Sequence, residues 1–213
     1  MALSNRPTPM RCFGNANAEV VQIMPMPAAS DSLLHAQASS AVTQRVGPTV
    51  IARLRAFAWD LPVIAAWGVV AGIVGLVLQG FGGVRLSTPW ALDITALLTM
   101  VLPVVLTFAY LEASSAHATW GKRRMRMRVM SADGADLGRG RSLLRSAVKF
   151  APWQMGHTAV FHLLAGSTAV AFLILSLLAQ ALVVASVLVM ALDGRHRALH
   201  DWVAGTQVVR EES

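Results

Sequence analysis

The stretch LPVIAAWGVVAGIVGLVLQ, residues 61–79, contains no charged side chain and decides the class of fold. With residues 56–60 as a first turn, it reaches the roughly twenty residues that an α-helix needs to cross the hydrocarbon core of a bilayer. A second apolar run covers residues 94–111, with Trp90 and Tyr110 placed as interfacial aromatic side chains. The sequence therefore predicts two membrane-spanning helices in this half of the chain.

The apolar stretch at residues 151–192 is too long for a single crossing. Its titratable side chains are His157 and His162, and a helix rises by only about 1.5 Å per residue. Gly166-Ser167-Thr168 is the natural break. We expect a third segment before this break that is a short crossing or a re-entrant hairpin, and a full spanning helix at residues 169–192 after it.

The composition supports a membrane protein and argues against a soluble fold. Of the 213 residues, 55% are hydrophobic and 14% are charged, and the mean hydropathy is +0.55. The formal net charge of +7 comes from short basic blocks between apolar runs. Membrane topology explains that pattern better than nucleic-acid binding does.

The distribution of basic residues predicts the orientation in the membrane. Residues 122–149 hold nine Lys or Arg and two Asp, whereas the connection at residues 80–89 holds one Arg. Basic loops face the cytoplasm. A second basic block at residues 195–197 predicts that the chain crosses an even number of times and has both termini in the cytoplasm.

Residues 122–150 are predicted to form a cytoplasmic basic segment. A turn at residues 131–136 should join a short strand-like run at residues 125–130 to an amphipathic helix at residues 141–150, which we expect along the membrane surface. The basic run at its start is expected to contact anionic lipid headgroups or to determine topology; its members are Lys122, Arg123, Arg124, Arg126 and Arg128.

The chain is predicted to contain one membrane domain, residues 49–209, between two tails. Residues 1–48 are rich in Ala, Ser, Pro, Asn and Gln and lack a sustained apolar period, so they predict a disordered N-terminal tail. Residues 210–213 form a short C-terminal tail. The single cysteine, Cys12, excludes an intramolecular disulfide and a multi-cysteine metal site.

Arg53 and Asp60 mark one stripe of the first helix. They are seven residues apart, so their side chains point almost the same way, about 10 Å apart along the helix axis. A carboxylate just inside the hydrocarbon boundary requires a partner or a water-filled cavity. A salt bridge that fixes helix packing and a role in transport both fit this arrangement.

Two prolines could expose backbone carbonyls to a cation. Pro62 lacks an amide proton and frees the Ala58 carbonyl near Asp60, and Pro103 does the same for Thr99. Irregular backbone at membrane depth is tolerated where it lines a cavity. Simple helix kinks are the alternative interpretation.

The remaining polar side chains do not predict catalysis. Glu112 is expected to be a solvated carboxylate at the end of the second helix. The chain contains no phosphate-binding glycine loop, nucleophile elbow or zinc-protease motif. We therefore expect a protein that is not an enzyme, with no cofactor and no metal site.

Three separated elements match one known pattern. They are RLRAFAWD at residues 53–60, TWGK at residues 119–122 before the basic run, and RALHDWVAGT at residues 197–206. Together they make the chain resemble the RDD family of membrane proteins. The family is named for one arginine and two aspartates, which fall here on Arg53, Asp60 and Asp201.

The resemblance implies an all-α integral membrane protein with a bundle of about four hydrophobic helices. For this family a role in transport, including cation/proton exchange, has been proposed. We therefore expect transport of a cation, a proton or a small solute. On this hypothesis Arg53, Asp60, Asp201 and the adjacent His200 form one functional cluster, in which Asp60 binds a cation or proton, Arg53 sets its pKa and Asp201 closes a cytoplasmic gate. The opposing hypothesis is a non-catalytic scaffold or assembly protein in which the same residues form a static network.

The expected surroundings follow from these interpretations. The chain should be a multi-pass protein of the cell membrane, inner or plasma, in contact with the bilayer and its anionic headgroups. A cation or a proton is the expected small partner, and nucleic acid is not expected. The sequence leaves homo-oligomerisation open.

Overall fold

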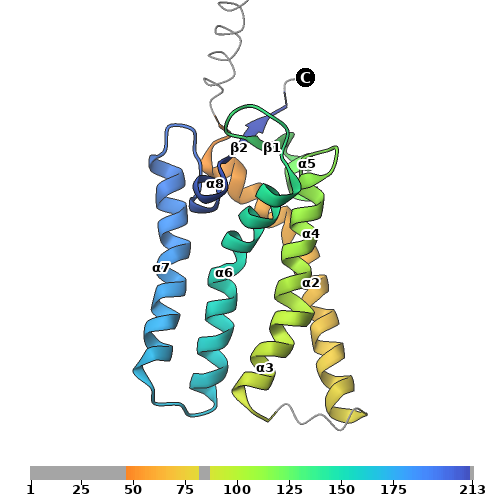
Figure 1. Cartoon of the computed structure of the whole chain (residues 1–213), viewed down its shortest axis with the longest axis vertical. Coiled ribbons are helices and arrows are strands. Elements are labelled where there is room, and N and C mark those ends of the chain that lie inside the picture. The colour runs from red at the N-terminus through yellow and green to blue at the C-terminus, as the bar shows by residue number, and fades with distance from the viewer. Residues whose placement is uncertain (1–46, 82–86, 212–213) are drawn as a thin grey trace, which may run out of the picture. The chain divides into compact units, whose positions relative to one another are not determined.

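The computed structural model describes residues 47–81 and 87–211, all within one compact unit, Ala38–Ser213. The predicted N-terminal tail lies almost entirely outside the described residues. The long helices run side by side, and the strands gather at one end of them (Figure 1). The elements are α2 (Val50–Gly80), α3 (Pro89–Ala96), the π-helical η1 (Leu97–Val101), α4 (Leu102–Ala113), α5 (Trp120–Arg124), β1 (Met127–Ser131), α6 (Arg139–Leu164), α7 (Val170–Leu192), α8 (Leu199–Ala204) and β2 (Thr206–Arg210).

Three helices are long and apolar enough to cross a membrane: Val50–Gly80, Pro89–Ala113 and Val170–Leu192. Their outer faces carry large apolar side chains, such as Leu76 and Leu177, which are mostly exposed. A lipid environment is the solvent that these faces require. The chain is a multi-pass membrane protein, as the apolar runs predicted.

The second span is longer than predicted and contains a local irregularity. It begins at Pro89, with Thr88 as its N-cap, and ends at Ala113. Pro103 lacks an N–H, so the helix widens just before it into η1, where Leu102 N donates to Leu97 O. A π-helical turn is one way to accommodate a proline within a span.

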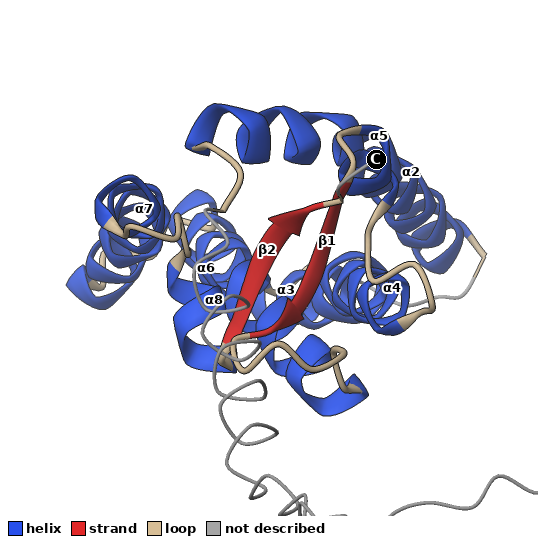
Figure 2. Cartoon of the chain, turned by 90° about the horizontal axis from the view of Figure 1, so that it is seen from above, coloured by secondary structure: helices blue, strands red, loops and turns tan. Residues whose placement is uncertain are grey.

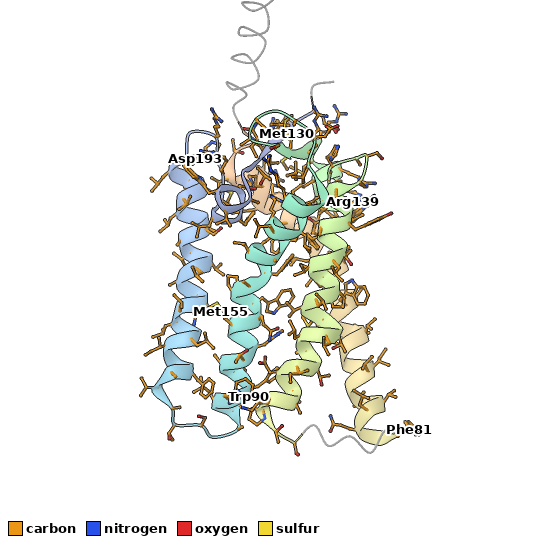
Figure 3. The ribbon with its side chains drawn as sticks, viewed as in Figure 1. Phe81, Trp90, Met130, Arg139, Met155 and Asp193 are labelled. Carbon is orange, nitrogen blue, oxygen red and sulfur yellow. The ribbon has the colours of Figure 1, made fainter. Side chains whose placement is uncertain are left out.

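The prediction of a surface helix followed by a separate short third segment is wrong. The two regions form one continuous helix, α6, with Pro152 inside it. Figure 3 places Arg139 at the polar end of the bundle and Met155 near its middle, so α6 runs down through the bundle. Proline removes one hydrogen bond but does not end the helix here, because Phe150 packs against α2 and α4 on one side of the bend.

The predicted break after α6 is confirmed. Gly166 has φ +83°, a left-handed conformation that glycine adopts without strain. The chain then enters α7, which spans Val170–Leu192. The fourth long helix therefore lies where the sequence predicted it.

Two short strands close one end of the bundle. The predicted strand-like run becomes β1, and it pairs with β2 in antiparallel register from Met127↔Arg210 to Ser131↔Thr206. Arg210, expected to start the C-terminal tail, is the last residue of β2. Figure 2 shows this ribbon lying across the helix ends.

Two small apolar clusters form in the interior of the described part of the chain. One lies under the ribbon and joins Met127, Val129 and Val208 to Ala52 and Ala56 of α2. The second lies deeper in the bundle and is formed by Ile64, Val101, Val104, Val105, Phe108 and Phe150. The polar side chains described next lie near the end that the ribbon covers.

Candidate functional site

The centre of the site is a chain of buried ion pairs that we call the ion-pair network: Arg53, Glu112, Lys122, Arg145 and Asp201. Arg53 Nη2 lies 2.5 Å from Asp201 Oδ2, and Arg145 Nε lies 2.8 Å from Asp201 Oδ1. Arg145 Nη1 also pairs with Glu112 Oε2, whose Oε1 lies 2.6 Å from Lys122 Nζ. Each side chain is at least nine-tenths buried.

Asp201 is held by neutral donors as well as by the two arginines. It is the third residue of α8, and its carboxylate accepts from Ala198 N at 3.0 Å and from Thr206 Oγ1 at 3.3 Å. A carboxylate in the first turn of a helix caps free amides there. Burial alone would raise the pKa of Asp201, but Arg145 and Arg53 lower it well below its usual range.

The predicted exposure of Glu112 and Lys122 is wrong. Glu112 was expected to be solvated and Lys122 to contact lipid headgroups or to determine topology, yet their exposed fractions are 0% and 7%. Burial contradicts solvation of Glu112 and headgroup contact by Lys122, whereas the role of Lys122 in topology stays a prediction. Each requires the other, because a buried charge is tolerated only with an opposite charge at contact distance. Burial lowers the pKa of Lys122, and Glu112 opposes that shift.

Arg145 joins the two halves of the network but was not singled out from the sequence. It is 1% exposed and bridges Asp201 to Glu112. The sequence did contain an indication that Arg145 could be buried. Ser142, Arg145 and Ser146 lie on one helical face, just before the long apolar stretch. All three are buried.

Asp60 does not join the predicted cluster. Within residues 47–81 and 87–211, no hydrogen bond or ion pair joins it to Arg53 or Asp201. Its Oδ2 accepts from Thr119 Oγ1 at 2.7 Å and its Oδ1 accepts from Gly121 N at 2.7 Å. Asp60 therefore fastens the start of α5 to α2, and the TWGK motif supplies its donors.

The residues proposed to line a cation site lie elsewhere. Ala58 and Pro62 are exposed on the outer face of α2, because residues two apart on a helix point to nearly opposite sides. Thr99 Oγ1 donates to the Thr95 carbonyl within its own helix at 2.6 Å. Neither they nor Pro103 line the cavity described below.

The other members of the basic run differ from Lys122. Arg123, Arg124 and Arg126 are exposed, and Arg128 is partly buried in β1. Arg124 stacks its guanidinium on Trp59, 4.3 Å from the ring centroid. Contact with headgroups stays a prediction for these four residues.

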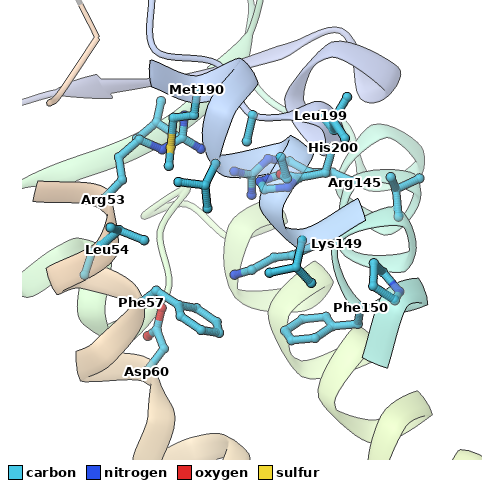
Figure 4. A pocket seen from close by; sticks show the side chains of 18 of the residues that line it. Arg53, Leu54, Phe57, Asp60, Arg145, Lys149, Phe150, Met190, Leu199 and His200 are labelled. Carbon is cyan, nitrogen blue, oxygen red and sulfur yellow. The ribbon is translucent and has the colours of Figure 1, made fainter. Parts of the chain in front are cut away.

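A cavity of about 600 Å³ lies between α2, α6, α7 and α8. Most of its lining is apolar, but four cationic side chains reach it: Arg53, Lys122, Arg145 and Lys149. His200 and Asp60 also line it. In Figure 4, Lys149 extends from α6 into the space that faces α2.

Lys149 differs from the other three cations because no ion pair to it occurs in the described part of the chain. Its Nζ lies over the rings of Phe57, Phe108 and Phe150, at 4.6, 4.5 and 5.1 Å from their centroids. Cation–π contacts compensate part of the lost hydration. Lys149 is therefore the cationic side chain of this cavity wall that has no ion-pair partner among the described residues.

His200 is close to Asp201 without forming a short contact. Its Nε2 lies 3.9 Å from Asp201 Oδ1. Burial lowers the pKa of His200 well below its usual value; Asp201 opposes this shift, and Arg145 and Lys149 add to it. A neutral imidazole at this position fits the positive surroundings.

Comparison with known protein families gives a match over most of the chain. The profile of the RDD family matches residues 48–205, which covers more than half of the chain and includes Arg53, Asp60, Arg145, His200 and Asp201. No curated protein and no solved structure matches the chain.

Proposed function

The chain belongs to the RDD family of membrane proteins, and on that premise we propose that it transports a small anionic, amphiphilic solute. The cavity between α2, α6, α7 and α8 would bind this solute. The observation that carries the proposal is an apolar cavity with Lys149, which has no ion-pair partner in the described residues, in its wall. Such a site suits a ligand with an apolar chain and one negative charge.

The charge in the cavity wall favours an anion over a cation. Of the four cationic side chains in the lining, three pair with Asp201 or Glu112 and Lys149 does not. Asp60 is the single carboxylate in the lining, and both its oxygens already accept hydrogen bonds. A metal ion would require free carboxylate or carbonyl oxygens. We therefore prefer a small anionic solute to the cation that the sequence suggested.

In this proposal the solute enters the cavity between α2 and α7. Leu54 of α2 and Val183 of α7 line the cavity, and their exposed fractions are 45% and 55%. Lining residues that are also exposed on these two helices support entry from the face that a bilayer would cover. An amphiphile could enter there from the hydrocarbon region without crossing water.

In this proposal the ion-pair network has a structural role. Its carboxylates are saturated with donors, so it fixes the ribbon and α8 over the cavity, as the scaffold hypothesis held. Breaking a buried ion pair is costly, which suits a rigid wall. The chain would then be a transport protein, not an enzyme, with the network as its support.

Binding of oleate, with oleyl alcohol as the uncharged counterpart, tests the proposal in the purified full-length chain. Lys149→Met retains the apolar stem and removes the charge. We expect about tenfold weaker oleate binding, equal to about 1.4 kcal/mol, and unchanged binding of oleyl alcohol. The matched control is Arg124→Met, which removes an exposed cation and should leave both affinities unchanged.

A second pair of variants tests the cavity itself. Ser186→Trp places a ring in the cavity and should abolish binding of both probes, whereas Leu177→Trp on the exposed face of α7 should not. Equal affinity of the wild type for oleate and oleyl alcohol would refute an anion site. A cation flux in proteoliposomes that disappears in Asp60→Asn, with oleate binding intact, would favour cation transport instead.

We also expect both termini on the cytoplasmic side of the cell membrane. The start of α2, the basic run and β2 share one end of the bundle, and basic segments are retained in the cytoplasm (Figure 1). A reporter after Ser213 should be active inside, and one inserted at Thr168 should be active outside. A C-terminal reporter active only outside would rule out this topology.

A further inference from the structure

A second polar site lies between α3 and α6, and it centres on Asp93. This carboxylate is 8% exposed and lies one turn inside the Pro89–Ala113 span. No ion pair to it occurs among the residues that the structure describes. An ionisable side chain within a membrane span without a counter-charge costs several kcal/mol, so it requires an explanation.

Neutral side chains of α6 surround Asp93. Gln154 Nε2 donates to Oδ1 at 2.6 Å, and Thr158 Oγ1 lies 2.9 Å from each carboxylate oxygen. One turn further along, the ring of His162 meets the ring of Trp90 at 4.4 Å between centroids. These three hydrogen bonds and one aromatic contact join α3 to α6.

The geometry accommodates the carboxyl group with or without a proton. Thr158 Oγ1 also lies 3.2 Å from the Gln154 carbonyl. When Asp93 is ionised, the threonine hydroxyl can donate to the carboxylate. When Asp93 is protonated, the Thr158 hydroxyl can donate to the Gln154 carbonyl and accept a hydrogen bond from the carboxyl O–H group. No heavy atom needs to move between the two states.

Three buried polar atoms of α6 near this group have no hydrogen-bond partner in the described part of the chain: Gln154 Oε1, His157 Nδ1 and His162 Nε2. His162 belongs to the last turn of α6, directly before the loop at residues 165–169, and its ring contacts Trp90, three residues before Asp93. A buried ring nitrogen without a partner is a group that can relay a proton.

We propose that Asp93 is a proton-binding site within the membrane, which exchanges its proton through His162 with the water at the α6–α7 turn. The ligand is a proton, and the bond formed is the O–H bond of the carboxyl group. This site goes beyond the proposed solute transport, since it lies outside the cavity lining. The titratable side chains that face it are His157 and His162 of α6; residues 61–80 of α2 and all of α7 contain none.

Infrared difference spectroscopy of the full chain in bilayers tests the proposal directly. Stepping the pH between about 4 and 9 should change the carbonyl band of a protonated carboxylic acid, and Asp93→Asn should remove that change. Asp133→Asn, at an exposed turn, is the matched control and should leave the buried band unchanged.

Two threonine variants separate proton binding from helix packing. Thr158→Val removes a hydrogen bond to the carboxyl group and should shift the frequency of its carbonyl band, whereas Thr158→Ser should leave the band in place. Identical difference spectra for the wild type and a well-folded Asp93→Asn would overturn the proposal. If Asp93→Asn fails to fold, an unchanged carbonyl band in Thr158→Val would overturn it instead. Oleate binding is measured separately, so a failure of one proposal does not decide the other.

Discussion

Replacement of Arg145 by methionine should lower the free energy of unfolding by about 3–5 kcal/mol, the usual cost of breaking a buried ion pair from one side. Arg145 is 1% exposed and compensates both Asp201 and Glu112. Methionine fills much of the volume but leaves both carboxylates with fewer positive partners. Reversible unfolding in mixed micelles measures the change.

The control for this variant lies one turn earlier on the same helix. Arg141 pairs with Asp133 at 3.3 Å, but its side chain is 50% exposed. Exposed ion pairs contribute at most about 1 kcal/mol, so Arg141→Met should unfold almost like the wild type. An equal decrease in the free energy of unfolding for Arg145→Met and Arg141→Met would show that burial of the ion-pair network does not determine stability.

Replacement of Gly121 by alanine should cost about 2–3 kcal/mol, in the range of an overpacked interior. A Cβ at this position would overlap the Ala56 carbonyl and lie 3.0 Å from the Asp60 carboxyl carbon. Backbone cannot give way as a flexible side chain can, so α5 must move away from α2. The Gly121 N–H would then lose its 2.7 Å contact with Asp60.

A glycine in open space provides the comparison for Gly121. Gly140 lies in the first turn of α6, and a Cβ there would meet nothing within 4 Å. Gly140→Ala should be neutral or stabilise the helix by up to about 1 kcal/mol. A Gly121→Ala protein as stable as Gly140→Ala would show that the close approach of α5 and α2 is not required.

Apolar runs and the residues that interrupt them were sufficient to predict three of the long helices: α2, the Pro89–Ala113 span and α7. Residues 61–79 lack charge, so water is a poor solvent for them whatever they pack against, and the glycine break before α7 depends on local backbone freedom. The motif pattern also named Arg53 and Asp201, which the structure brings into contact. These properties depend on short segments and their preferred solvent.

Which charges are buried together was decided by the tertiary structure. Glu112, Lys122 and Arg145 lie in separate elements, and their burial depends on α4, α5 and α6 meeting under the ribbon. Asp60 was assigned to the wrong partner because helical spacing describes one helix, whereas its donors come from residues 119–121. The continuity of α6 across Pro152 likewise depends on packing against α2 and α4. Local sequence reports the preference of each segment for water or lipid, but an ion pair forms only where the fold excludes water from two distant side chains at once.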